Sequence, residues 1–357
     1  MDGYFRISIV SRKYINLSSM KVTSIIIVLL LVFSCSDKKY NPKKNLTIVF
    51  YNVENLFDLE DEAGKQDEEF TPEGTKKWTK DRYAKKLSDL SKVLSSVNTQ
   101  ELPEVIGLCE VENKKVVEDV FKSGDFAVAK YKVVHYESPD FRGIDCALAY
   151  NSAEMEVLSS QAIRISFAGE PDYGTRDILY VKGRMNNKQD FHFFVNHWPS
   201  RIGGSEKTEP YRMHVASVVK TKVDSILSEE LRASIVIMGD MNDEPNNKSI
   251  LETLGASQKL DANSALVNLM APVAKEGKGT YNFRGNWNML DNMIISSALA
   301  VGGKGYVCEE MRGNIFREEW MEYKNDKGET SPNRTYGGPN YYGGISDHFP
   351  VYISLSR

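Results

Sequence analysis

The stretch that decides the fold is IVIMGDMNDEP, residues 235–245. Four apolar residues form a run typical of a buried β-strand, and the polar segment GDMND follows at once. Gly, Asp and Asn are ordinary turn residues, so this segment taken alone predicts a turn after the strand. The alternative is a strand whose polar end, with Asp240 and Asn242, binds a ligand.

The rest of the chain predicts an α/β protein with several such strands. Some strands alternate apolar and polar residues and others are uniformly apolar, which indicates sheets buried on one or both faces. Helices are predicted at 81–97 and 209–231, and one domain at 46–357, because no linker divides the body. The predicted strands cover residues 46–53, 104–111, 145–151, 178–185, 190–197, 234–240, 290–296 and 349–355.

Polar groups gather at the ends of these strands. Each group alone has an ordinary interpretation as a turn, a surface carboxylate or a structural histidine. Six such ends in one chain, all carboxylate, amide or imidazole, fit poorly with six independent turns. The residues concerned are Asn52, Glu110, His197, the pair Asp240 and Asn242, Asp291, and the pair Asp347 and His348.

The donor types at these ends suit a hard cation. Carboxylate and amide oxygens prefer Mg²⁺, with Mn²⁺ or Ca²⁺ as alternatives, and the four cysteines show no metal-site spacing. An aspartate beside a histidine fixes its tautomer and stabilises the imidazolium. Attack of water on a phosphorus ester needs a base, a cation and a donor near the leaving oxygen. The sequence offers all three.

Seven segments resemble the successive motifs of the endonuclease/exonuclease/phosphatase superfamily, in the same order. GDxN and SDH are each weak alone, but seven motifs in order across residues 46–355 are specific. The resemblance implies a four-layer αββα sandwich, in which two packed mixed β-sheets are flanked by helices. The segments are FYNVENLFD, GLCEVEN, RGIDCALAY, VNHWPSR, GDMNDEP, LDNMIIS and SDHFPVY.

The resemblance also implies roles for the residues at the strand ends. Asn52, Glu110 and Asp347 match the family's metal site, with Glu110 as the principal ligand. His348 matches the histidine beside the scissile phosphate, and Asp291 matches the carboxylate that orients it.

Two further positions match residues that act on the phosphate. Asp240 and Asn242 match the pair that positions water or contacts phosphate, with Gly239 expected to allow a tight turn. His197 matches a second histidine of the deoxyribonuclease and sphingomyelinase branches. The general base, His348 or Asp240, stays open.

Several arginines are candidate phosphate ligands, because a guanidinium binds phosphate oxygens with two donors. Arg142, Arg176 and Arg201 are the candidates, with a surface or ion-paired role as the alternative for each. Weaker candidates are Asp145, Arg334 and Tyr336. Cys109 and His192 are expected to be structural, and His135 and His214 belong to no motif.

The N-terminal segment predicts export. A nine-residue apolar run, Ile25 to Phe33, is shorter than the ~20 residues that span a bilayer and fits a signal-peptide core over residues 1–34. The segment LVFSC resembles a bacterial lipobox, which predicts lipidation of Cys35 and a polar tether over 35–45. The alternative is an ordinary secretory signal or a poor membrane anchor. Residues 1–19 do not resemble a signal n-region, which favours Met20 as the translation start. We therefore expect a protein anchored to the cell envelope by lipid alone.

Charge and context bear on the substrate. Residues 1–34 have a net charge of +3, which leaves −7 for the rest of a chain whose total is −4. So acidic a protein gains no overall attraction to nucleic acid or anionic lipid. The favoured expectation is nevertheless a monomeric, exported endonuclease without a protein partner. The alternatives are a phosphatase or phosphodiesterase acting on small phosphoesters, phosphoinositides or sphingomyelin, and a non-catalytic binding protein on the same fold.

Overall fold

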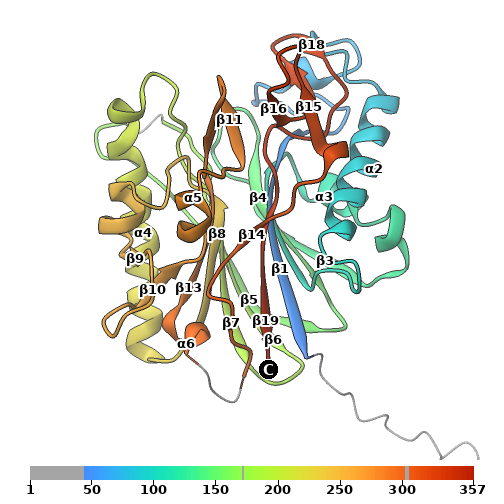
Figure 1. Ribbon diagram of the computed structural model, residues 1–357. Coiled ribbons are helices and arrows are strands. Elements are labelled where there is room, and N and C mark those ends of the chain that lie inside the picture. Colours follow the sequence, from blue (N-terminus) through green and yellow to red (C-terminus); the bar gives the residue numbers. More distant parts are fainter. Residues whose placement is uncertain (1–43, 171–172, 302–304) are drawn as a thin grey trace, which may run out of the picture. The chain divides into compact units, whose positions relative to one another are not determined.

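A computed structural model describes residues 44–170, 173–301 and 305–357. Residues 43–357 form one compact unit (Figure 1). The predicted signal peptide, Cys35 and most of the predicted tether lie outside the described residues. Among the described residues, no helix is long and apolar enough to cross a membrane.

Two mixed β-sheets form the centre of this unit. The first has six strands, in the order β14 (Asn314–Ile315), β19 (Val351–Ser356), β1 (Asn45–Leu56), β2 (Val105–Val111), β4 (Asp145–Asn151) and β3 (Tyr131–His135). The second has seven, in the order β5 (Met155–Ile163), β6 (Ile178–Met185), β7 (Asp190–His197), β8 (Ser234–Asp240), β13 (Asp291–Ser296), β10 (Leu266–Asn268) and β9 (Ala256–Ser257).

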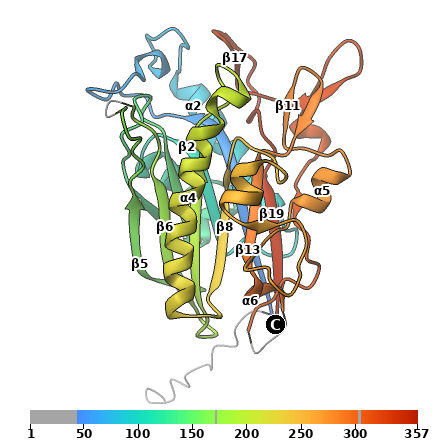
Figure 2. The same ribbon diagram turned by 90° about the vertical axis from the view of Figure 1, so that its left-hand side faces the viewer.

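Helices cover both outer faces, which confirms the predicted four-layer sandwich (Figure 1). Helices α2 (Lys80–Ser96) and α3 (Lys114–Val120) cover the six-stranded sheet. Helix α4 (Ser205–Glu229) runs along the outer face of the seven-stranded sheet (Figure 2). The remaining helical segments are short: α5 (Ala271–Lys275), α6 (Ser297–Ala300), η1 (Glu68–Phe70), η2 (Gly124–Val128), η3 (Ser249–Thr253) and η4 (Glu319–Met321).

The uniformly apolar strands contribute side chains to two hydrophobic cores, one on each face of their sheet. In β8, Val236 and Met238 pack between the two sheets, whereas Ile235 and Ile237 pack under α4. Successive side chains of a strand point to opposite faces, so a strand covered on both sides is apolar at every position. This explains the apolar run before Gly239.

Strand directions bring the functional ends to one edge of the sandwich. β1 is parallel to β2 and β7 to β8, while β19 and β13 run antiparallel to β1 and β8. The carboxyl ends of the first four strands therefore share an edge with the beginnings of the last two. The chain enters β1 at the opposite edge, where the backbone N–H of Arg357 donates to the carbonyl of Lys44.

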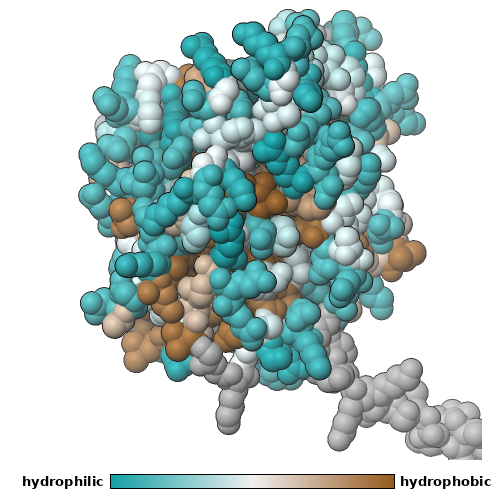
Figure 3. Space-filling view, viewed as in Figure 1, coloured by the Kyte–Doolittle hydropathy of each residue, from teal (hydrophilic) through white to brown (hydrophobic). Residues whose placement is uncertain are grey.

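Three small hairpins extend from the functional edge, and their surroundings are polar. They are β11 (Tyr281–Phe283) with β12 (Asn286–Asn288), β15 (Glu322–Lys324) with β16 (Thr330–Pro332), and β17 (Tyr336–Gly337) with β18 (Asn340–Tyr341). On the face seen in Figure 3, the end with these hairpins is mostly hydrophilic. Hydrophobic side chains gather instead over the region of β10, β13 and α6 (Figure 3).

Candidate active site

The strand registers bring the predicted residues from distant parts of the chain together. Asp240 lies opposite His197 of β7 on one side and Asp291 of β13 on the other. On the other sheet, Asn52 lies opposite Cys109, the residue before Glu110. Because both sheets end at the same edge, these side chains converge between them.

Four non-glycine residues at or next to the site-facing ends of β1, β2 and β8 have left-handed backbone conformations. Glu54, Asn55, Glu110 and Asn242 have φ angles of 50°, 54°, 61° and 49°. Such residues cost of order 1 kcal/mol each and concentrate at functional sites. At Glu110 the β1–β2–β4 register also shifts, which turns its side chain toward the site. The backbone N–H of Asn55 donates to Glu110 Oε2 at 3.0 Å and fixes that carboxylate.

One face of the site is a set of close polar contacts around Asn52. Its Nδ2 donates to Asp240 Oδ2 at 3.0 Å and to Glu110 Oε1 at 3.3 Å. The Nε2 atom of His197 lies 3.8 Å from Glu110 Oε1 and 3.7 Å from Asp240 Oδ2. Burial lowers the pKa of His197 well below its usual range, and the positive charges of Arg176 and Arg142 act in the same direction. His197 is therefore a neutral imidazole.

His348 and Asp291 form the opposite face. His348 Nδ1 lies 2.7 Å from Asp291 Oδ2, and His348 Nε2 lies 3.8 Å from Asp240 Oδ2. Burial alone disfavours the charged imidazole, but the negative charges of Asp291 and Asp240 outweigh it and hold the pKa of His348 well above its usual range. Tyr281 lies against this histidine, with ring centroids 4.9 Å apart.

Asp240 is central to both faces, because it lies among Asn52, His197 and His348. Burial raises the pKa of Asp240 to about 7, while the charge of His348 acts in the opposite direction. Its Oδ1 accepts from the backbone N–H of Asn242 at 2.9 Å. Asn242 forms the turn, since it has the positive φ angle.

The predicted turn role of Gly239 is wrong. Gly239 lies within β8 and pairs with Asn196 and Asn292, and a Cβ there would lie 2.4 Å from the carbonyl oxygen of Asn196.

Two of the candidate arginines are held by protein groups. Arg176 is buried, donates to Asp140 Oδ2 at 2.9 Å and to the carbonyl of Trp198 at 2.7 Å. Arg201 donates to the carbonyl of Asn242 at 2.6 Å, and its other nitrogen atoms contact Asn288, Asp243 and Asn247.

Arg142 differs from these two arginines. Its Nε lies 3.5 Å from Asp140 Oδ1, but its side chain is 38% exposed, and its charge adds to the effect of burial in lowering the pKa of His197. We therefore interpret Arg176 and Arg201 as positioning residues and Arg142 as a phosphate-binding candidate.

A buried lysine that belongs to no motif joins two segments next to the site by hydrogen bonds. Lys86 of α2 donates to the carbonyl of Glu54 at 3.0 Å, to Thr335 Oγ1 at 2.7 Å and to the carbonyl of Ile345. The Glu54 carboxylate accepts from the backbone N–H groups of Thr335 and Tyr336. On a helix surface such a lysine is ordinarily exposed, so the sequence offers no signal for it.

The remaining candidates lie around this centre or apart from it. Arg334 donates to Asp347 Oδ2 at 2.6 Å, and Tyr336 is buried beside Glu54. Asp145 faces His135. Cys109 lies in the core between the sheets, and His192 accepts or donates a hydrogen bond with the hydroxyl of Tyr180.

The donor chemistry fits a divalent cation with oxygen ligands. Glu110 and Asn52 are in contact, their neighbours are carboxylates and imidazoles, and the buried Oδ1 of Asp291 has no hydrogen-bond partner. Asp240, Asp291 and His348 also offer ligand atoms within 4.8 Å of one another. Asp347 lies at the same edge, with Arg334 as its partner.

Solved structures share this fold at low sequence identity. The mannosyl-6-phosphatase of Bacteroides thetaiotaomicron is 14% identical, with a TM-score of 0.53, and the match covers 87% of this chain and 100% of that one. The D. rerio TDP2 in complex with a single-strand DNA product is 16% identical, with a TM-score of 0.52 over 88% and 100%. An endonuclease/exonuclease/phosphatase family protein from Bacteroides thetaiotaomicron is 16% identical, with a TM-score of 0.53 over 88% and 98%.

Sequence comparison is decisive where structural likeness shows only the fold. No curated protein sequence matches the chain. The sequence profile of the Endonuclease/Exonuclease/phosphatase family, however, matches residues 47–357. Because that match spans nearly the whole described unit, the chain belongs to the endonuclease/exonuclease/phosphatase family, whose members hydrolyse phosphoester bonds.

Proposed function

We propose that the protein is a divalent-metal-dependent phosphodiesterase that cleaves nucleic acid as an endonuclease. Glu110, with Asn52 and Asp347, would hold the cation. When bound, Mg²⁺ (or Mn²⁺ or Ca²⁺) supplies positive charge to a non-bridging phosphate oxygen. The contacts of Asn52 with both Glu110 and Asp240 support a site that joins the cation to the groups handling water.

The roles of the other residues follow from their contacts. Asp291 orients the His348 imidazole, and two carboxylates favour its charged form, so His348 stabilises charge that develops on the phosphate. Asp240 is then the group that accepts a proton from the attacking water. The neutral His197 donates a hydrogen bond to the pentacovalent state, and Asn242 supports it.

One repeated feature favours a nucleic-acid substrate. Two loops have the sequence Phe-Arg-Gly at their tips, at 141–143 and 283–285. Phe141 and Phe283 are 54% and 53% exposed, which is unusual for side chains of this size. Exposed aromatic rings beside arginine are the groups on which unpaired bases stack, at about 1–3 kcal/mol per base.

Both loops border the candidate site. The hairpin with Phe283 contains Tyr281, which forms an isolated β-bridge with His348. The other loop places the charge of Arg142 near His197. We therefore expect the backbone of a strand that stacks on both aromatic rings to pass beside His348 and His197.

A second candidate function has its own support. The net charge of −7 for residues 35–357 gives no overall attraction to a polyanion, and therefore favours a small phosphoester, a phosphoinositide or sphingomyelin as substrate. We also propose that the protein is exported and is fixed to the cell envelope through a lipid on Cys35. For the catalytic unit we expect a monomer.

The test compares two substrates on the same variants of the full-length protein. Supercoiled plasmid and bis-p-nitrophenyl phosphate are offered with Mg²⁺, Mn²⁺, Ca²⁺ or EDTA. Glu110→Gln and His348→Gln should abolish metal-dependent turnover of both. The double variant Phe141→Ala/Phe283→Ala should lose plasmid nicking at least about tenfold while keeping hydrolysis of the small ester.

Leu231→Ala is the matched control, because this residue is 87% exposed and precedes β8 at the end away from Asp240. Equal nicking by the double variant and by the wild type would exclude base stacking by these loops. Metal-dependent hydrolysis of the ester without any nicking would contradict a nucleic-acid substrate and favour a small phosphoester as the substrate.

A further inference from the structure

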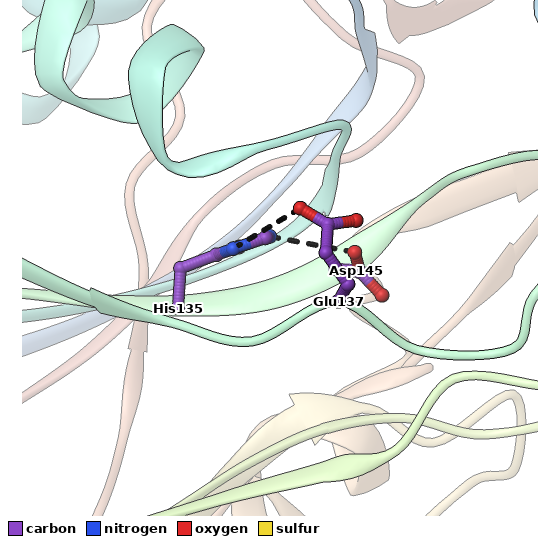
Figure 4. Close-up of side chains that lie close together, drawn as sticks. All are labelled: His135, Glu137 and Asp145. Atoms are coloured by element: carbon purple, nitrogen blue, oxygen red, sulfur yellow. Dashed lines mark ion pairs between the residues drawn. The ribbon is translucent and has the colours of Figure 1, made fainter. Parts of the chain in front are cut away.

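A second group of ligand-type side chains lies at one side of the six-stranded sheet, outside the site described above. His135 ends β3, Glu137 follows it and Asp145 begins β4. β3 and β4 are antiparallel with His135 opposite Ala147, and ligand atoms of His135, Glu137 and Asp145 lie within 4.8 Å of one another at this end of the strand pair. Figure 4 shows the imidazole of His135 facing both carboxylates.

The distances within this group are short and some of its atoms are unsatisfied. His135 Nδ1 lies 3.7 Å from Glu137 Oε1, and His135 Nε2 lies 3.4 Å from Asp145 Oδ2. The backbone N–H of Ser138 donates to Asp145 Oδ1 at 2.9 Å, but Asp145 Oδ2 and His135 Nε2 have no hydrogen-bond partner. Their side chains are only 1% and 3% exposed. A buried polar atom without a partner costs about 1–3 kcal/mol.

We propose that His135, Glu137 and Asp145 bind a divalent transition-metal ion, Zn²⁺ or Mn²⁺, at a site separate from the catalytic centre. Each of the three offers one ligand atom, and these atoms lie within 4.8 Å of one another. One imidazole with two carboxylates is a donor set for Zn²⁺ and its neighbours, whereas Mg²⁺ and Ca²⁺ prefer oxygen ligands alone. Glu137 is half exposed and gives the ion a route from solvent.

The ion would join both ends of the loop at 136–144. Two of its ligands precede the loop tip and the third follows it. Within the loop, Asp140 pairs with Arg176 at 2.9 Å and with Arg142 at 3.5 Å, and the charge of Arg142 acts on His197. Occupation of this site therefore fixes the segment with Phe141 and Arg142, and it couples a structural ion to the substrate-facing loop.

The experiment measures metal content directly. Purified full-length protein is stripped with chelator, equilibrated with Zn²⁺ and desalted, and the bound metal is counted by mass spectrometry. The Glu110→Gln/His348→Gln background removes the proposed catalytic ligand and the imidazole of the group formed by Asp240, Asp291 and His348, so a remaining ion with imidazole ligation reports on this site. We expect about one Zn²⁺ per chain in that background, with imidazole ligation in its X-ray absorption spectrum.

Variants in the same background decide the assignment. Adding His135→Gln should weaken Zn²⁺ binding at least about tenfold, and so should Glu137→Gln, whose exposed position leaves folding intact. His214→Gln is the matched control, since His214 is exposed, belongs to no motif and should leave the metal content unchanged.

Two results would overturn the proposal. The first is a Glu110→Gln/His348→Gln chain without bound Zn²⁺. The second is Zn²⁺ binding that neither His135→Gln nor Glu137→Gln weakens. Neither result depends on whether the protein cleaves nucleic acid.

Discussion

Replacing Lys86 with methionine tests whether a buried charge holds the candidate active site together. The Lys86 side chain is 2% exposed and joins three segments: α2, the end of β1 at Glu54, and the segment at 335–345 that precedes Asp347. Methionine keeps the apolar stem and removes the three donors. Glu54, itself 6% exposed, then loses the positive charge of Lys86, which favours its ionised carboxylate.

The expected magnitude follows from these contacts. Leaving a buried charge without its partner costs about 3–5 kcal/mol, so we expect Lys86→Met to lower the free energy of unfolding by about 4 kcal/mol. At about 2 °C per kcal/mol for a domain of this size, the melting temperature falls by about 8 °C. Adding Glu54→Gln to Lys86→Met should restore about 1–2 kcal/mol relative to the sum of the single changes.

Urea unfolding of the wild type, the two single variants and the double variant, in EDTA, measures the loss of unfolding free energy and the coupling between Lys86 and Glu54. Calorimetry measures the melting temperature. Lys85→Met is the matched control: its side chain is half exposed and pairs with Asp89 on the helix surface, so the change should stay within about 0.5 kcal/mol. A loss below about 1 kcal/mol for Lys86→Met, or strict additivity with Glu54→Gln, would refute the reasoning.

Three further predictions concern catalysis, pH and packing. His348→Gln and Asp291→Asn should each lower kcat for phosphoester hydrolysis about 10²–10⁴-fold, with little further loss in the double variant, and near wild-type kcat would reject the pair. Burial lowers the pKa of His192 from 6.5 to about 4. As the pH falls from 6.5 to about 4, the unfolded chain therefore binds a proton that the folded chain does not, and we expect about 2–3 kcal/mol of stability to be lost. Urea titrations of His192→Gln should show a smaller loss. Gly239→Ala should cost more than about 2 kcal/mol by calorimetry, because β7 backbone occupies the space for its Cβ, and an unchanged melting temperature would contradict this.

Strands covered on both faces were predictable from sequence, and an exposed edge strand was not. Each of the eight predicted strands has a counterpart, and the runs before Asn52 and Asp240 are apolar at nearly every position because two cores need them. Periodicity does not predict β5, because MEVLSSQAI alternates irregularly and is largely exposed at the edge of its sheet. Helix α4 begins at Ser205, four residues before the predicted start, because Pro210 near its beginning obscured the first turn.

The residues of the candidate site were also predictable, whereas the neighbouring residues that hold them in place were not. The polar residues at six strand ends predict the members of the site, and the structure brings most of these residues into contact around Asp240. Their catalytic roles stay predictions. The charge of Arg201 predicts a phosphate ligand, whereas only the tertiary fold shows that its guanidinium binds the carbonyl of Asn242 and neighbouring side chains. The role of Lys86 could not be predicted either, because only the tertiary fold decides whether a lysine on a helix is buried.

The direction of β1 has a consequence for how the protein is displayed. The chain enters this strand at Asn45 and reaches Asn52 about 23 Å further on, at ~3.3 Å per residue. An attachment through the N-terminal segment therefore reaches the folded unit at the end remote from Glu110. The loops with Phe141 and Phe283 lie at the other end of this unit, so the point of attachment leaves the approach of a long, flexible polymer to the catalytic groups unobstructed.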